Sequence, residues 1–514
     1  AFARSRSGGL LSMIRGDKEE AKDSLSTPLM VVGKQGSGKS TLFVNLALEF
    51  FGVRAKNREE WEKIARSVFL FDVADGAMVS ETLKHVPEWL RDRVVILNHA
   101  DMKRIVPLGW HDLMRLYEGD DSIAAEVAAI ETELLRKFLH DESQTFSIER
   151  FFKSALQASY RVGEGNLLDA VRILKDADYR KELKERLEAT DFELEIALSQ
   201  IDEEAEEGGR VLETIENRVA QMRSNKQLFY SLSQKPDERI DFWKWMNEPH
   251  LVLIHIPNGR ELFQDYAFSH YLAKLWRLMM ARERIPKVER RECAVIVDEI
   301  DLVIKNKPIQ NIFLQITKKP RKYRVKYIFS FHDWSSFARA ANMKSELIRS
   351  FKTGMDMILL KGSDEVFKDF QAEPFTVEDF HQLRKYEGIF RITANKQEHV
   401  FQARLLEPAA MRLPSFPVPD LGNRFGMQKE EIVRRAREIL LPLYTRNDGI
   451  EENWTAKDKI LFFLRNSPGG VTSEQICKEV GIRRETFSRL WQELPITKKR
   501  VGNTTLYFLR ETRP

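Results

Sequence analysis

Nine consecutive residues near the start of the chain have the composition of a phosphate-binding loop. Residues 33–41 read Gly-Lys-Gln-Gly-Ser-Gly-Lys-Ser-Thr, which fits the spacing G-x-x-x-x-G-K-[ST]. Glycines let such a loop turn tightly, so that successive backbone N–H groups converge on a phosphate at the start of a helix. Lys39 is predicted to bind the β- and γ-phosphates and Ser40 to hold Mg²⁺. The predicted nucleotide-binding residues are Gly33, Gly36, Ser37, Gly38, Lys39, Ser40 and Thr41.

A pair of acids farther along the chain supplies the second part of this chemistry. Residues 293–297 are Cys-Ala-Val-Ile-Val, a continuous apolar run typical of a buried parallel strand, and Asp298 and Glu299 follow directly. Asp298 is predicted to complete the Mg²⁺ site, and Glu299 to polarise the attacking water. The two motifs together predict an ATP hydrolase that uses ATP and Mg²⁺.

Both motifs require a sheet that brings the ends of distant strands together. Apolar runs that predict strands lie at residues 29–32, 68–72, 94–97, 251–256, 293–297, 325–330, 355–360 and 388–393. We expect an α/β fold with a sheet of about eight mainly parallel strands, whose carboxyl ends carry the ligand site. The expected class is a RecA-like P-loop NTPase motor.

Other parts of the chain predict a division into domains. Residues 110–245 contain long charge-rich helical patterns and no convincing strand, and Pro408, Pro414, Pro417 and Pro419 mark a semi-rigid linker. A chain of 514 residues is too long for one core. The expected parts are an N-terminal segment (1–24), a motor (25–109 and 246–407), an all-helical insertion domain (110–245), a linker with a basic helix (408–454) and a C-terminal winged-helix domain (455–514).

The C-terminal module is predicted to bind DNA. Residues 455–514 have a net charge of +6, whereas the entire chain has a net charge of +4. Helix patterns at 455–464, 473–480 and 483–494 precede two strand-like runs, which is the order of a winged helix. A winged helix that binds protein is the alternative. The predicted contacts to bases or phosphates are Arg483, Arg484, Thr486 and Arg489 in the recognition helix and Lys498, Lys499 and Arg500 in the wing.

The composition limits the location of the protein. With 43% hydrophobic and 31% charged residues, the chain has the composition of a globular protein, and no apolar run approaches the roughly 20 residues that span a bilayer. Cys293 and Cys477 are too few for a disulfide framework or a Cys-based zinc site. We expect a cytoplasmic protein. Because the chain begins with Ala and a polar stretch, an anchor upstream and association with the inner face of the membrane stay open.

The arrangement of these motifs resembles the HerA/FtsK superfamily of ring ATPases, in particular the conjugative coupling proteins and related type IV secretion ATPases. The resemblance covers residues 25–407: the phosphate loop, a strand ending in Asp72, a helical domain that splits the motor, and Asp298 and Glu299 at a strand end. It implies assembly as a homo-oligomeric ring, usually a hexamer, that moves DNA through a central pore.

The resemblance also assigns two further residues. The segment 319–325 is similar to the turn that carries the family's arginine finger, and the matching position is Arg321. The family's glutamine sensor of the γ-phosphate corresponds to His332 here, and a purely structural histidine is the alternative. Pro320 and Ala74 also differ from the family pattern, where Gly and Lys are usual.

These observations favour a DNA translocase driven by Mg-ATP, with Lys39, Glu299, Arg321 and His332 as its catalytic residues. Conjugative transfer and genome packaging are settings that fit such a motor. One alternative is a type IV secretion ATPase that powers protein transport or channel assembly with a partner in the secretion machinery or the membrane. The other is an ATP-regulated DNA-binding protein that does not translocate.

Overall fold

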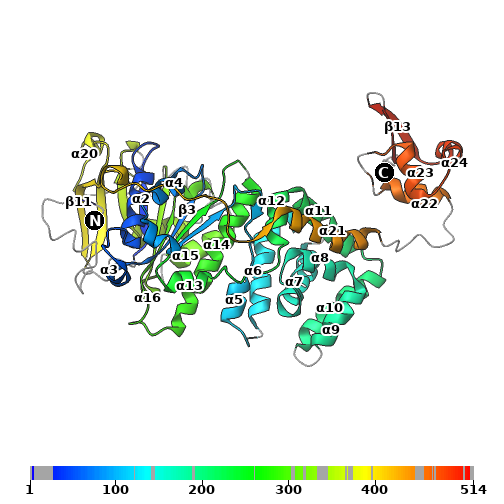
Figure 1. Ribbon diagram of the computed structural model, residues 1–514, viewed down its shortest axis with the longest axis horizontal. Helices are drawn as coiled ribbons and strands as arrows, with labels where there is room; N and C mark the ends of the chain where they lie inside the picture. Colours follow the sequence, from blue (N-terminus) through cyan, green and yellow to red (C-terminus); the bar gives the residue numbers. More distant parts are fainter. Residues whose placement is uncertain are drawn as a thin grey trace. The chain divides into compact units, whose positions relative to one another are not determined.

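The computed structural model describes residues 3–4, 27–120, 122–139, 145–187, 191–259, 261–302, 307–316, 320–332, 345–364, 367–368, 374–394, 397–445, 456–465, 467, 470–501 and 504–509. The chain divides into two compact units, residues 1–439 and 440–514, which are coloured from blue to orange and from orange to red in Figure 1. Most of the expected N-terminal segment, residues 1–24, lies outside the described residues.

A sheet of ten described strands lies at the centre of the larger unit, in the order β1-β11-β10-β9-β2-β8-β7-β3-β6-β4. The strands from β9 to β4 in this order are parallel, whereas β10, β11 and β1 are antiparallel. The predicted α/β fold with a mainly parallel sheet is therefore confirmed. The strands are β1 (Ala3–Arg4), β2 (Leu29–Val32), β3 (Ser67–Asp72), β4 (Val94–Asn98), β6 (Leu251–His255), β7 (Cys293–Val297), β8 (Val325–Phe331), β9 (Asp356–Leu360), β10 (Glu387–Ala394) and β11 (Gln397–Leu405).

All eight strands expected from apolar runs are present, and the sheet is larger by β11 and β1. Every residue of the central strands β2, β3 and β7 is buried, because helices cover both faces of this part of the sheet. In β11 most positions are exposed or half-buried, only Ala403 and Leu405 are buried, and the sequence contains Gln397, Glu398 and Gln402. A strand of this kind has no apolar run, so it was missed.

Side chains alternate between the two faces of the central strands. Val68 and Leu70 of β3 belong to a core cluster that includes Leu42 and Phe43 of the first helix, α2. Phe71 points to the other face, where its ring lies 5.7 Å from that of Phe268 on α14. The helices that surround the sheet are α2 (Lys39–Phe51), α3 (Arg58–Ile64), α4 (Ala77–Lys84), α14 (Glu261–Ala281), α15 (Lys307–Ile316), α16 (Pro320–Tyr323), α18 (Ser345–Gly354) and α20 (Val377–Gln382).

Between β5 (Arg104–Ile105) and β6, all described elements are helices. The helices from α5 to α12 lie on one side of the sheet region in the larger unit, whereas α13 packs on β3 (Figure 1). Helix α14 contacts both α6 and α12. The boundaries 110 and 245 of an insertion domain stay a prediction, since sheet and helices belong to one compact unit. The helices are α5 (His111–Leu116), α6 (Ser122–Leu139), α7 (Thr145–Val162), α8 (Leu167–Lys175), α9 (Ala177–Leu187), α10 (Phe192–Glu206), α11 (Arg210–Ser224), α12 (Lys226–Leu232) and α13 (Phe242–Asn247).

A buried carboxyl group lies where this helical region meets α14. Glu131 of α6 accepts hydrogen bonds from Trp110 Nε1 at 2.9 Å, from Tyr160 OH at 2.5 Å and from Tyr266 OH at 3.2 Å. Burial raises the pKa of Glu131 to about 7, and the three donors oppose this shift. The folded protein therefore binds a proton at Glu131 more tightly than the unfolded chain does.

We expect the stability of this region to fall as the pH rises through the titration of Glu131. Because the folded pKa is raised, the stabilising contribution is complete below about pH 4.5 and is lost as the pH approaches 7. The change amounts to about 3 kcal/mol at 1.36 kcal/mol per pKa unit. Urea denaturation at pH values between 5 and 8 gives the free energy of unfolding of the wild type and of Glu131→Gln. We expect this free energy to depend less on pH in the variant. Two parallel profiles would contradict it.

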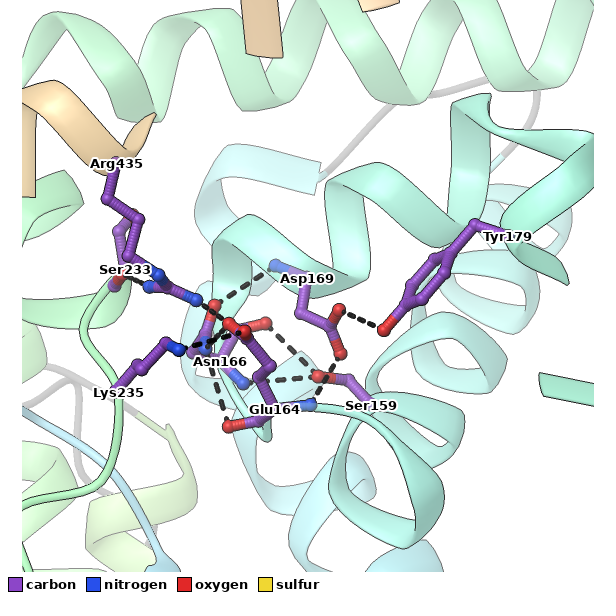
Figure 2. A network of polar contacts seen from close by, with 8 residues as sticks. All are labelled: Ser159, Glu164, Asn166, Asp169, Tyr179, Ser233, Lys235 and Arg435. Carbon is purple, nitrogen blue, oxygen red and sulfur yellow. Dashed lines mark hydrogen bonds and ion pairs between the residues drawn. The ribbon is translucent and has the colours of Figure 1, made fainter. Parts of the chain in front are cut away.

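The basic helix predicted after the linker is α21 (Lys429–Thr445), which follows β12 (Met427–Gln428). Arg435 of α21 is buried rather than solvated: its Nη1 donates to Ser233 O at 2.7 Å, and its guanidinium forms an ion pair with Glu164. Figure 2 shows this contact among Ser159, Asn166, Asp169, Tyr179 and Lys235. The amino-terminal half of α21 is therefore fixed on the helical region.

In its described residues the smaller unit has three α-helices of its own, a short 3-10 helix (Trp491–Glu493) and a hairpin. Its core includes Ile460, Leu464, Ile476, Phe487 and Ile496. The elements are α22 (Ala456–Arg465), α23 (Ser473–Val480), α24 (Arg484–Leu490), β13 (Ile496–Val501) and β14 (Thr504–Leu509), and Val471 forms a bridge to Tyr507 of β14.

Candidate active site

The predicted phosphate loop connects β2 to α2 at the carboxyl edge of the sheet. Gly36 and Gly38 have φ values of 77° and 105°, which side chains with a Cβ rarely adopt, and Gly38 caps the amino end of α2. A Cβ on Gly33 would lie 2.5 Å from Ser37 Oγ. The backbone path therefore requires glycine at positions 36 and 38, and close packing against Ser37 and Leu360 requires it at position 33.

Lys39 lies in the first turn of α2 together with Ser40 and Thr41. Its side chain is buried, and Nζ donates to Gly33 O at 2.6 Å and to Lys34 O at 3.3 Å. Burial lowers the pKa of Lys39, whereas the nearby carboxylates of the acid pair raise it. The ammonium group thus lies inside the loop.

Asp298 joins the two predicted motifs. Ser40 Oγ donates to Asp298 Oδ2 at 2.9 Å, which links the start of α2 to the end of β7. The other carboxylate oxygen, Oδ1, accepts a hydrogen bond from Ser330 Oγ on the neighbouring strand β8. Asp298 and Ser330 are buried, so their hydrogen bond is shielded from bulk water, whereas Ser40 is exposed and its hydrogen bond lies at the solvent boundary. The structure therefore brings Ser40 and Asp298 together, as predicted.

Glu299 is held in an uncommon backbone conformation. Its φ is 52°, and its N–H group donates to Ser330 Oγ at 3.0 Å and to Asp298 Oδ1 at 3.1 Å. Burial raises the pKa of the Glu299 carboxyl, and the negative charge of Asp298 raises it further. The side chain of Glu299 is 30% exposed, so it can reach a water molecule at the site.

His332 follows the last residue of β8 and lies beside the acid pair. Its Nε2 is 3.6 Å from Glu299 Oε1, and its Nδ1 is 3.8 Å from Asp301 Oδ2. These separations exceed normal hydrogen-bond lengths, but they place the imidazole between two carboxylates. The structure thus brings His332 to the acid pair.

The backbone of Arg321 lies at the other end of the sheet. It belongs to α16, which precedes β8, whereas Asp298 and Glu299 follow the carboxyl end of the parallel strand β7. The seven residues of β8 span about 23 Å at 3.3 Å per residue. The side chain of Arg321 lies outside the described residues. The structure does not bring Arg321 to the other three catalytic candidates of the same chain, Lys39, Glu299 and His332.

The predicted DNA contacts all lie in the smaller unit. Arg483 is the residue before α24, and Arg484, Thr486 and Arg489 are on this helix. The three arginines are exposed, whereas Thr486 is half-buried. Lys498, Lys499 and Arg500 were predicted in a turn, but they are exposed residues of β13, because strand pairing with β14 continues to Val501.

Three residues near the site were not predicted. Ser330 and Asp301 contact the acid pair and His332, as described above. Tyr386 has a φ of 66°, and its ring lies 3.0 Å from the position of a Cβ on Gly38. The only signal in the sequence was proximity to a predicted motif: Asp301 is two residues after Glu299, and Ser330 ends an apolar run.

Comparison with known proteins identifies the fold. No protein-family model matches the chain, and no curated protein matches it. Two solved structures of the plasmid coupling protein TrwB match it, one in complex with the non-hydrolysable GTP analogue GDPNP and one in an unbound monoclinic form. Each has a TM-score of 0.50 and a sequence identity of 14%. The match covers 83% of this chain in both cases, 96% of the TrwB chain in the first structure and 97% in the second.

The chain has the fold of the coupling protein TrwB. A structure of VirB4 of Thermoanaerobacter pseudethanolicus also matches, with a TM-score of 0.44 and 16% sequence identity. This match covers 75% of the present chain and 90% of the VirB4 chain. The expected RecA-like class of the motor is therefore confirmed at the level of the fold. At 14% identity the roles of individual side chains depend on the geometry of this chain.

No helix in the described parts is long and apolar enough to cross a membrane. Within the same residues, no group of three or more His, Cys, Asp or Glu side chains has the arrangement of a metal site.

Proposed function

We propose that this protein hydrolyses ATP with Mg²⁺ and uses the energy to move DNA. One observation carries the proposal: the hydrogen bond of 2.9 Å between Ser40 Oγ and Asp298 Oδ2 joins the phosphate loop to the acid that ends β7. The similar fold of TrwB, which was solved with a GTP analogue, supports nucleotide binding at this loop.

The residues present fit a Mg²⁺ ion bound with a nucleotide. Ser40 and Asp298 offer two hard oxygen atoms next to each other, and Mg²⁺ in such sites keeps several water molecules and phosphate oxygens. Ser37 Oγ is buried without a hydrogen-bond partner among the described residues, at a place where a phosphate oxygen would satisfy it. When bound, Mg²⁺ would neutralise charge that develops on the β- and γ-phosphate oxygens.

The side chains of this chain divide the remaining chemistry. Lys39 binds the β- and γ-phosphates, and the N–H groups of the loop hold their oxygens. Glu299 orients the attacking water and accepts its proton, and its raised pKa makes it a stronger base than a free glutamate. His332, beside Glu299, donates a hydrogen bond toward the γ-phosphate.

The hydrogen bonds of Ser330 suggest a test of the metal site. Ser330→Ala removes the donor to Asp298 Oδ1 and the acceptor of the Glu299 N–H group. Hydrogen bonds to charged groups contribute about 1.5–3 kcal/mol, so we expect the Mg²⁺ concentration for half-maximal ATPase activity to rise about tenfold or more. A magnesium titration measures this change. Ser269→Ala, which alters a buried hydroxyl on α14, is the control; an equal shift in both variants would contradict the prediction.

The proposal includes DNA transport by a homo-oligomeric ring, a hexamer, and the fold and the exposed cations of the smaller unit support it. A bridge between Val471 and Tyr507 beside the β13–β14 hairpin is the strand arrangement expected of a winged helix. Its exposed arginines and lysines suit phosphate contacts. A cytoplasmic location, with or without membrane association, belongs to this proposal.

Steady-state ATPase rates with duplex DNA, with single-stranded DNA and without DNA test the proposal. DNA-stimulated turnover that is lost in the triple variant Lys498→Ala/Lys499→Ala/Arg500→Ala supports it. Turnover without stimulation would reject DNA translocation and favour the secretion ATPase. ATP-dependent DNA binding with negligible turnover would favour the regulatory protein.

A further inference from the structure

The strand at one end of the ten-stranded sheet has a partly covered edge. β4 pairs with β6 on one side only. His99 N donates to His255 O across this pair. The backbone N–H and C=O groups of every second residue, that is, of His99, Leu97 and Val95, are therefore directed toward β6. Asn98, Ile96 and Val94 therefore point their N–H and C=O groups outward.

At Asn98 this outer edge is occupied by a side chain that imitates a strand. Asn423 Oδ1 accepts from Asn98 N at 2.8 Å, and Asn423 Nδ2 donates to Asn98 O at 2.7 Å. The amide of Asn423 thus supplies the acceptor and the donor that a neighbouring peptide group would supply. Ile96 lies two residues before Asn98 on the same strand. Its backbone N–H and C=O groups form no hydrogen bond with any of the described residues.

A cavity lies beside this unpaired peptide group. Its volume is about 250 Å³, and the residues that line it include Val94, Val95 and Ile96 of β4, Trp245 of α13, and Pro419 and Phe425. This volume is slightly below the range of about 300–1,000 Å³ typical of small-molecule sites. A short stretch of extended peptide fits such a cavity better than a large ligand does.

The cavity is also rich in arginine. Arg91, Arg239 and Arg424 line it, and the Nε atom of Arg91 is buried without a hydrogen-bond partner among the described residues. Asp92 is the acid in the lining, and it forms an ion pair with Arg58 at 2.8 Å. Arg239 is already paired with Asp237 at 2.6 Å, and Arg91 lies 3.6 Å from Glu88. Arg424 and the Nε atom of Arg91 are therefore the positively charged groups that a ligand in the cavity could still bind.

We propose that this edge of β4 binds an extended acidic segment of a partner protein, which adds to the sheet at Ile96 and places carboxylates on the arginines. Strand addition supplies one donor and one acceptor to the peptide group of Ile96, and Arg side chains bind carboxylates in a bidentate manner. A nucleic-acid backbone is a poorer occupant, because phosphates offer only acceptors and leave the C=O of Ile96 unpaired.

Fluorescence anisotropy with the full chain tests the proposal. The probe is a labelled eight-residue peptide in which Glu alternates with Val. Peptides with Lys in place of Glu, and with Pro at two central positions, are the peptide controls. We expect the acidic peptide to bind, Arg91→Ser/Arg424→Ser to weaken binding about tenfold or more, and both control peptides to bind at least tenfold more weakly. Arg434→Ser/Arg437→Ser changes two exposed arginines of α21 and should leave affinity unchanged.

Two measurements separate strand addition from simple charge attraction. Ile96→Pro removes the outward N–H group, which edge strands tolerate, and should weaken binding while thermal denaturation reports an intact fold. If that variant fails to fold, slower hydrogen exchange of Ile96 in the peptide complex of the wild type takes its place. Equal binding of the proline peptide, no binding at millimolar peptide, or tighter binding of a twelve-residue oligo(dT) through the same arginines would overturn the proposal.

Discussion

Glu299→Gln is expected to lower kcat for ATP hydrolysis by about a hundredfold to ten-thousandfold, the usual contribution of a general base. Gln has nearly the same shape and can still orient water, but it cannot accept a proton. The backbone of Glu299 is fixed by its N–H bonds to Ser330 and Asp298, so the variant should keep the local structure. Binding of a fluorescent ATP analogue should change little, which separates loss of chemistry from loss of binding.

The pH dependence of kcat provides a second readout for Glu299. Because burial and Asp298 raise its pKa, the carboxyl becomes protonated at a higher pH than an ordinary glutamate does. We expect kcat to decrease as the pH falls, with a midpoint above the pH at which an ordinary glutamate is protonated. This acidic limb of the pH profile should be absent in Glu299→Gln. Asp301→Asn, which alters the neighbouring acid near His332, is the matched control. A Glu299→Gln variant with more than a tenth of the wild-type rate would exclude Glu299 as the base.

The sequence predicted the parts of the fold that depend on continuous burial. Strands such as β2 and β7 are buried on both faces, so each appears as an apolar run, and the glycines of residues 33–38 report a tight turn directly. The meeting of Ser40 with Asp298 was predictable, because parallel strands β2, β8 and β7 end at one edge. Sheet order and motif spacing together determine this contact.

Contacts made by ordinary polar residues were beyond sequence reasoning. Ser330 looks like a serine near the end of an apolar strand, and its position against Asp298 depends on the register of β8 and β7. Asn423 lies in a proline-rich linker, yet its side chain is hydrogen-bonded to Asn98 of β4, which is 325 residues earlier in the chain. Arg435 belongs to the basic helix predicted after the prolines, but its burial against Ser233 and Glu164 could not be predicted from a pattern of charged residues. Tertiary packing alone sets such contacts.

The position of Arg321 requires that any catalytic role be played in a neighbouring subunit. Within one chain, the seven residues of β8 separate α16 from the edge that carries Ser330 and His332, a span of about 23 Å, which an arginine side chain cannot bridge. An arginine finger supplied by another subunit contributes about 10³–10⁵ in kcat. Arg321→Ala should therefore nearly abolish turnover in the assembled protein.

Mixing experiments decide between action within a chain and action between chains. Arg321→Ala subunits keep an intact phosphate loop, and Lys39→Ala subunits keep Arg321, so each variant alone should be inactive. If Arg321 acts across an interface, mixed assemblies regain ATPase activity wherever an intact loop faces an intact arginine. If Arg321 acts within its own chain, no site in the mixture is complete and activity stays absent. Arg324→Ala, which changes the next arginine along the chain, is the control: its Nη1 donates to Arg290 O at 2.9 Å, so its expected role is structural and mixing should not alter its effect.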